Sequence, residues 1–198
     1  ESDNTAKLAK AMASSLGMLV LMILAGTLSM PSYLSAQNLE FMSSYALPDG
    51  AYGITLVNNL AYIANDFNGL QILDVTDPYN PTGVGNYDTP GYTRSVFVSA
   101  NYAYIADGDN SLVIVDITNP AAPSLVGSYD TSGTALTVFV AGSYAYIANG
   151  YSGMIVIDVS DPSNPILAGT YNSFGYIMGV SVSGTYAFVT ANFTEPDY

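Results

Sequence analysis

The sequence predicts an all-β protein, a β-propeller built of four-stranded blades, and three observations support this fold class. Short apolar runs rich in Val, Ile and Tyr alternate with turns rich in Gly, Pro, Asn and Asp. The chain repeats itself with a period of about 42 residues, which is typical of propeller repeats. Each repeat contains four such runs, and four short strands in about 40 residues are typical of a propeller blade.

The period is read from four similar segments, which recur at a constant spacing along the chain. They are AYIAND, AYIADG, AYIANG and AFVTAN, beginning at Ala61, Ala103, Ala145 and Ala187. The same shift aligns the flanking apolar runs without a gap. A flat solenoid is the alternative architecture, but its repeats are usually shorter.

The phase of the repeat sets the expected blade boundaries. Complete blades are expected at about residues 50–91, 92–133 and 134–175, with a partial blade at 176–198 and a lone outer strand at 38–46. An ordinary ring has about four to eight blades, so we expect an incomplete propeller. Further blades in a longer chain, or self-association through the open blade edges, would complete it.

The third apolar run of each repeat ends in an aspartate followed by a proline turn. In the second repeat this run is SLVIVDIT (111–118), and both of its alternating faces are apolar, which predicts burial on both sides. The aspartates are Asp74, Asp116 and Asp158. We expect a structural role for them, as acceptors of hydrogen bonds from turn N–H groups, because catalysis seldom needs one residue per blade.

The same third run carries a family resemblance. Residues 112–116 spell LVIVD, and residues 70–74 (LQILD) and 154–158 (MIVID) are close variants. The chain resembles the LVIVD-repeat family over about residues 38–192. The resemblance implies a β-propeller in an exported or cell-surface protein of bacteria or archaea, and it implies no particular reaction.

The composition excludes several classes of function. The chain has no Cys and no His, which excludes disulfides, zinc sites and Ser-His-Asp or Cys-His catalysis within it. Its formal net charge is −13, and such a surface repels phosphate backbones, so no nucleic-acid partner is expected.

Residues 1–37 have the composition of an export signal. Lys7 and Lys10 precede the apolar stretch 16–30, and Pro31 and small residues follow it. This order is typical of a secretory signal peptide. An uncleaved N-terminal membrane anchor is the alternative, although a membrane span needs about 20 apolar residues. Either interpretation predicts a secreted or cell-surface protein.

Candidate binding residues lie in the loops after the second and fourth strands, which vary most among the repeats. They are Asp66, Phe67, Tyr92, Arg94, Asp107, Asp109, Asn110 and Tyr151. Unconstrained drift of these loops is the competing explanation. Asp107, Asp109 and Asn110 could supply oxygen ligands to Ca²⁺, but the rest of a calcium-loop pattern is missing and a solvated turn is the alternative.

We therefore expect a non-enzymatic, exported module that binds an extracellular protein or glycan, with no catalytic residues and no required cofactor. One alternative is a propeller enzyme of the glycosidase or lyase type, since carboxylates alone can cleave glycosides. A calcium-dependent carbohydrate binder is the other.

Overall fold

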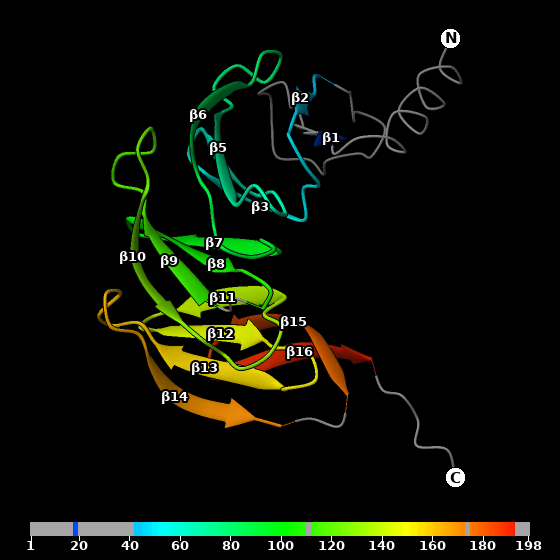
Figure 1. Cartoon of the computed structure of the whole chain (residues 1–198), viewed down its shortest axis with the longest axis vertical. Helices are drawn as coiled ribbons and strands as arrows, with labels where there is room; N and C mark the ends of the chain where they lie inside the picture. The colour runs from blue at the N-terminus through cyan, green and yellow to red at the C-terminus, as the bar shows by residue number, and fades with distance from the viewer. Residues whose placement is uncertain (1–17, 20–41, 110–111, 173–174, 193–198) are drawn as a thin grey trace, which may run out of the picture.

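The computed structural model describes residues 18–19, 42–109, 112–172 and 175–192 of the chain. All the secondary-structure elements within these residues are β-strands (Figure 1). The described part contains no helix long and apolar enough to cross a membrane.

Three successive sheets have four antiparallel strands each, hydrogen-bonded in chain order. The first sheet contains β3 (Gly53–Val57), β4 (Leu60–Ala64), β5 (Leu70–Asp74) and β6 (Thr82–Tyr87). The second contains β7 (Ser95–Ser99), β8 (Tyr102–Ala106), β9 (Leu112–Asp116) and β10 (Ser124–Tyr129). The third contains β11 (Thr137–Ala141), β12 (Tyr144–Ala148), β13 (Met154–Asp158) and β14 (Ile166–Tyr171). A two-stranded sheet of β15 (Tyr176–Ser183) and β16 (Tyr186–Asn192) follows.

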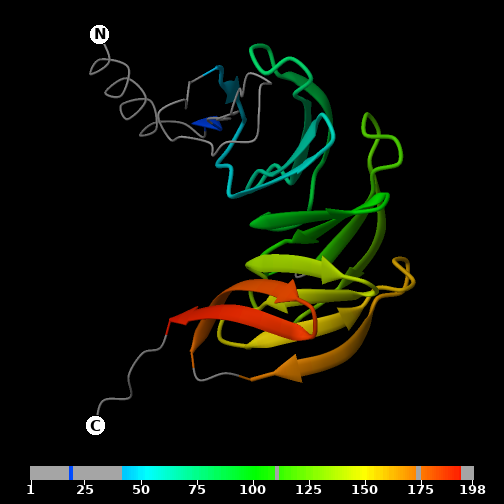
Figure 2. The same cartoon turned by 180° about the vertical axis from the view of Figure 1, so that it is seen from behind.

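The sheets are the blades of an open propeller, as the repeat predicted. The first strands of successive blades, β3, β7, β11 and β15, contact one another in that order. The fourth strands β6, β10 and β14 lie at the opposite margin of the molecule (Figures 1 and 2). Each third strand meets its fourth strand through a shift in register, a bulge that increases the local twist.

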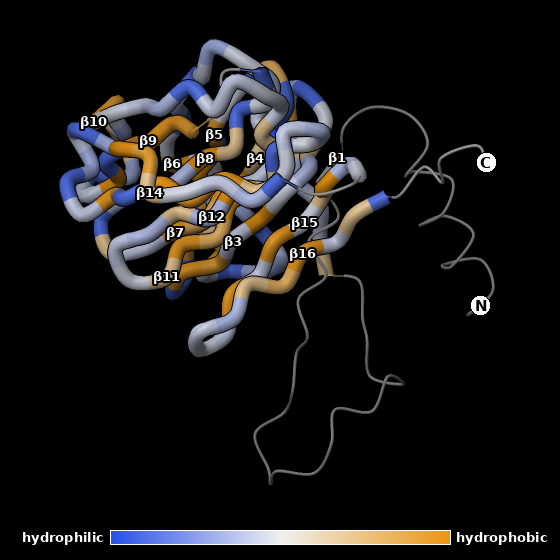
Figure 3. The backbone as a smooth tube through the Cα atoms, turned by 90° about the horizontal axis from the view of Figure 1, so that it is seen from below, coloured by the Kyte–Doolittle hydropathy of each residue, from blue (hydrophilic) through white to orange (hydrophobic). Residues whose placement is uncertain are grey.

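The hydrophobic core consists of the layers between blades. One layer joins Tyr62 and Ile72 of the first blade to Val96 and Ile105 of the second. The strand β9 contributes to two layers, since Val113 belongs to this layer and its neighbour Ile114 to the next. Both faces of the LVIVD strand are therefore buried, and the apolar strands lie inside a polar surface of loops (Figure 3).

The aspartate that ends each third strand fixes the turn after it. The Oδ1 atoms of Asp74, Asp116 and Asp158 accept the N–H of the residue two positions later, at 2.7, 2.7 and 2.9 Å. Hydrogen bonds from Thr76 and Thr118 lower the pKa of Asp74 and Asp116. The recurring aspartate thus holds the backbone between the third and fourth strands.

Each outer strand lies directly against the proline turn of the next blade. A Cβ atom added at Gly85 would collide with the carbonyl oxygen of Pro120, and one at Gly127 with that of Pro162. At Gly169, the equivalent residue of the third full blade, no atom of the described residues lies within 4 Å of an added Cβ. At Gly85 and Gly127 the absence of a side chain therefore allows this close approach.

Residues 42–47 occupy the place of a preceding outer strand. Ser43, which aligns with Gly85, donates from its hydroxyl to the carbonyl of Pro78 at 2.6 Å. Tyr45 and Leu47 pack against Ala61, Ile63 and Leu73 of the first blade, on the side away from the second blade. The expected outer strand at 38–46 is described only from residue 42, and within it only β2 (Tyr45–Ala46) is a strand.

The strand β2 pairs with β1 (Met18–Leu19). An export signal or anchor at residues 1–37 is expected to be separate from the propeller, so this pairing differs from the expectation. An edge strand presents unpaired N–H and C=O groups, which an extended apolar segment can satisfy. The rest of the leader lies outside the described residues.

The two glycine environments predict opposite results for the same substitution. Gly127→Ala places a methyl group against the Pro162 carbonyl, so we expect a loss of about 1–3 kcal/mol in the free energy of unfolding. Gly169→Ala meets open space and should change it by less than about 0.5 kcal/mol. Urea denaturation of both variants measures the difference. Equal losses would contradict this account of the outer-strand contact.

Candidate binding face

The loops after the second and fourth strands are tied together along one face of the propeller, here called the loop face. A backbone bridge joins the loop after each second strand to the start of the next blade. The pairs are Asp66 with Thr93, Gly108 with Ala135, and Gly150 with Ile177, which recur at the spacing of the repeat. The loop face is therefore held by backbone hydrogen bonds, and its exposed side chains project from a fixed frame.

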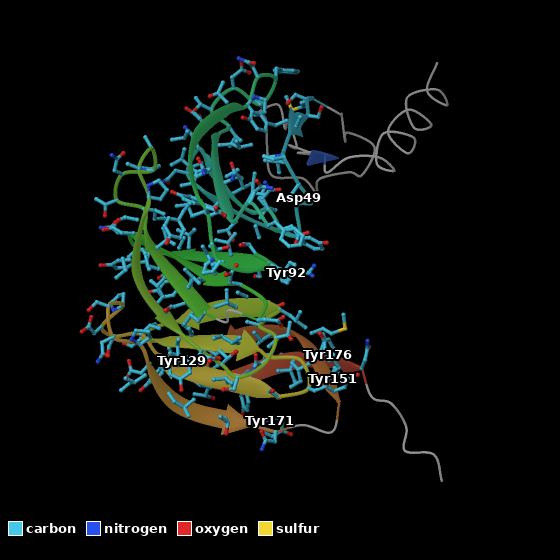
Figure 4. The ribbon with its side chains drawn as sticks, viewed as in Figure 1. Asp49, Tyr92, Tyr129, Tyr151, Tyr171 and Tyr176 are labelled. Atoms are coloured by element: carbon cyan, nitrogen blue, oxygen red, sulfur yellow. The ribbon has the colours of Figure 1, made fainter. Side chains whose placement is uncertain are left out.

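Next to each bridge, a side chain of one loop contacts a side chain of the following blade. Phe67 lies edge-to-face on Tyr92, with 4.5 Å between ring centroids. Tyr151 lies in the same way on Tyr176, at 4.7 Å. At the equivalent position between these pairs, the Thr134 hydroxyl donates to Asp109 at 3.0 Å. The labelled rings Tyr92, Tyr151 and Tyr176 all lie along one margin of the molecule (Figure 4).

The aromatic rings of this face remain accessible to a ligand. Phe67 is 59% exposed and Tyr151 is 78% exposed. Exposed aromatic pairs of this kind are enriched at protein interfaces, because they offer a large contact area with little conformational freedom to lose.

An open depression of about 440 Å³ lies where the first strands begin. Its lining includes one residue from the same repeat position in every blade: Tyr52, Arg94, Leu136 and Met178. Gly53, Ser95 and Thr137 line the rest. Because the first strands contact one another in succession, this depression is the mouth of the propeller axis.

Arg94 is the one basic residue in the part of the chain that the structure describes. Its guanidinium lies 4.4 Å from the centroid of the Tyr52 ring and 5.8 Å from that of Tyr92. Both distances fall within the range of cation–π attraction. Together with Phe67, these residues form an aromatic–arginine cluster at the mouth of the axis.

The structure brings three of the predicted residues, Phe67, Tyr92 and Arg94, into this cluster. Tyr52, Leu136 and Met178, which also line the depression, were not among the predicted residues. A signal for them was present, because a shift by whole repeats in either direction from Arg94 leads to them.

Asp107 belongs to a loop of this face, but its side chain is not available to a ligand, so the prediction that it is a binding residue was wrong. Its side chain is fully buried. One carboxylate oxygen accepts the hydroxyls of Thr89 and Thr93 at 2.6 and 2.9 Å, and the other accepts the Gly91 N–H at 2.8 Å. Burial raises the pKa of the Asp107 carboxyl, and these hydrogen bonds oppose the shift. The residue anchors the loop before its blade.

Asp66 is also largely buried, at 9% exposure, and so contributes little to the surface. Its backbone has a positive φ of 45° and forms the bridge to Thr93. Its Oδ1 atom has no hydrogen-bond partner among the described residues.

The proposed calcium ligands do not form a common cluster. The oxygens of Asp107 accept three hydrogen bonds inside the protein, whereas Asp109 is exposed and accepts from Thr134. Within the described residues, no three carboxylates lie close enough to hold a metal ion. Asn110 lies outside the described residues.

Asn65, Asp107 and Asn149 occupy the same repeat position and are all buried, and we call them the polar layer. The side chain of Asn65 differs from the other two because it lacks hydrogen-bond partners among the described residues. In the third blade, Asn149 accepts the Thr131 hydroxyl at 2.7 Å and donates to the Thr131 carbonyl at 3.0 Å. In the first blade, Asn65 is fully buried, but neither atom of its amide has a partner in the described chain. Leu47 stands where the next two repeats have threonine, which explains the missing bonds.

The fold and the repeated blade define a β-propeller repeat protein. The chain belongs to the LVIVD repeat family, whose model matches residues 50–89, 90–131, 132–173 and 174–193. This confirms the resemblance and the fold class inferred from the sequence. No curated protein matches the sequence.

Solved structures of similar fold have little sequence in common with this chain. The computationally designed Ika4 protein is 7% identical with a TM-score of 0.62, and the match covers 74% of this chain and 88% of Ika4. BamB from Moraxella catarrhalis is 13% identical with a TM-score of 0.59, and the match covers 75% of this chain and 46% of BamB. The chain therefore spans less than half the length of BamB, and these likenesses show the fold alone.

The polar layer predicts unequal effects for two equivalent asparagines. Asn149→Ala removes two buried hydrogen bonds, whereas Asn65→Ala removes none. We expect the Asn65 variant to be more stable than the Asn149 variant by about 1–3 kcal/mol. Thermal and urea denaturation of the pair measure this difference, and a greater loss at Asn65 would contradict the assignment.

The opposite pKa shifts of Asp107 and Asp116 predict opposite pH dependences. The raised pKa of Asp107 favours the folded state most at low pH, and this contribution is lost as the pH rises through the raised value. The lowered pKa of Asp116 favours the folded state above the ordinary carboxyl pKa and is lost as the pH falls. With rising pH, the stability gap between wild type and variant should shrink for Asp107→Asn and widen for Asp116→Asn. Urea denaturation at several pH values between about 3 and 7 measures both gaps, and parallel trends would exclude this assignment.

Proposed function

We propose that this chain is an exported, non-enzymatic β-propeller that acts as an interaction module at the cell surface or outside the cell. The observation that carries the proposal is the aromatic–arginine cluster beside the open axial depression. It combines accessible rings, one cation and an apolar floor in a frame held by backbone bridges. The leader supports export through its order of basic, apolar and small residues.

The chemistry of the cluster suits recognition. Arginine and aromatic side chains supply many of the strongest contacts at interfaces, since a planar guanidinium and a ring each bury large areas in a defined geometry. The two rings near Arg94 restrict its side chain before a ligand arrives, which reduces the entropy lost on binding. Leu136 and Met178 add apolar contact on the far side of the depression.

The lining of the depression supports binding over glycoside hydrolysis. Glycosidases place two carboxylates about 5–10 Å apart around the scissile bond. Among the described residues, those that line this depression include no Asp or Glu. The buried carboxylate of Asp107 already accepts hydrogen bonds from Thr89, Thr93 and Gly91.

An extracellular protein or glycan is the proposed partner, and matched variants test the site. Arg94→Ala and Phe67→Ala should each weaken binding to a glycan array, or to purified envelope proteins of the source organism, by at least about tenfold. Tyr79→Ala is the control, because Tyr79 is 65% exposed in a proline turn on the opposite face.

Equal binding by all three variants would remove the loop face from the proposed function. Hydrolysis of nitrophenyl glycosides by the wild-type chain would favour the enzyme alternative. Retention of the chain in the cytoplasm during expression would overturn export.

A further inference from the structure

The first blade exposes apolar residues that its counterparts bury. Ile54 and Leu56 on β3 are 42% and 54% exposed. The residues equivalent to Ile54 are Val96, Val138 and Val180, which are only 5%, 3% and 8% exposed. In each of those blades the preceding blade covers this position. We call the exposed surface of β3 the leading face.

The two-stranded blade exposes the complementary surface. Phe188 on β16 is 60% exposed, whereas its equivalents Tyr62 and Tyr104 are 4% and 5% exposed and the third equivalent, Tyr146, is partly buried. Tyr186 beside it is 70% exposed. Among the described strands, β16 pairs only with β15, whereas β4, β8 and β12 each have a third strand on the other side. We call the exposed surface of β16 the trailing face.

These two faces are the halves of an interface that the molecule already contains. Tyr62 of the first blade and Val96 of the second belong to one core layer. Tyr104 of the second blade and Val138 of the third belong to the next. Phe188 on the trailing face and Ile54 on the leading face hold these same two repeat positions. The repeat therefore defines the geometry in which one face covers the other.

The charge distribution also permits this contact. The chain carries a formal net charge of −13, which opposes association between copies. The strands of the two faces, GITLV and YAFVTAN, contain no charged residue. Exposed apolar edge strands without charge are the surfaces through which β-proteins associate.

We propose that two copies of this chain associate head to tail, with the trailing face of each covering the leading face of the other. Because the two faces differ, the contact is heterologous, and with two copies it closes into a ring. The described residues of one copy supply three four-stranded blades and one two-stranded sheet. The described parts of two copies therefore make eight blade units, which lies within the range of about four to eight seen in closed propellers. This inference does not depend on the proposed binding role of the loop face.

Two complementary variants of the full chain test the arrangement by size-exclusion chromatography with light scattering. The wild-type chain should be a dimer. Leu56→Lys and Phe188→Glu should each be monomeric at the same concentration, because every head-to-tail contact then contains one charged residue. An equimolar mixture should restore a dimer that contains one copy of each variant, since one interface is then wild type and the other pairs Lys with Glu.

The controls separate this result from unfolding and from other modes of association. Both residues are exposed in the single chain, so neither substitution should disturb its fold. The circular-dichroism spectrum of each variant should therefore match that of the wild-type chain. Leu125→Lys, on the outer strand of the second blade and 54% exposed, should remain dimeric.

Four outcomes would overturn the proposal. The first is a wild-type monomer, and the second is a series of open oligomers. The third is disruption by only one of the two variants, which indicates a symmetric contact through one face. The fourth is association that survives both substitutions, which indicates contact through the apolar segment 16–30.

Discussion

Each blade has to cover both faces of its sheet with apolar surface, and this requirement determines the rest of the structure. The LVIVD strand shows it most clearly, because Val113 and Ile114 are neighbours in sequence yet belong to different core layers. A sheet that is apolar on both sides gains little from folding alone and much from a neighbour on either side. The constant period follows from this, since each blade must present the same surface to the next. In the first and the last described units it also leaves apolar residues of β3 and β16 exposed.

The loop face combines a fixed interior with a variable surface. Asp107 and Asn149 hold the loops before their blades through buried hydrogen bonds, and the backbone bridges hold the loops after each second strand. The side chains next to these bridges differ from one blade to the next. Phe67 contacts the Tyr92 ring, whereas Asp109 at the equivalent position accepts a hydrogen bond from Thr134. A rigid scaffold with exchangeable side chains is the general basis on which loops acquire binding specificity.

The blade pattern could be predicted from the sequence because it depends on local periodicity and on repetition, which are both visible in one chain. The position of Asp107 could not be predicted in the same way. An aspartate in a Gly- and Asn-rich turn is typical of a solvated loop, and its burial depends on Thr89 and Thr93, which precede it by many residues. The axial depression was missed for a related reason. Tyr52, Arg94, Leu136 and Met178 are far apart in sequence, and only the curvature of the array brings them together.

The backbone bridges at residues 66, 108 and 150 also determine how the molecule responds to a pulling force. Each bridge joins one blade only to its immediate successor, and the described chain contains no bridge that skips a blade. Tension applied across the array would therefore load these links in series, so that each link bears the whole force. Closing the ring would give every blade two neighbours and would spread the same load over two paths.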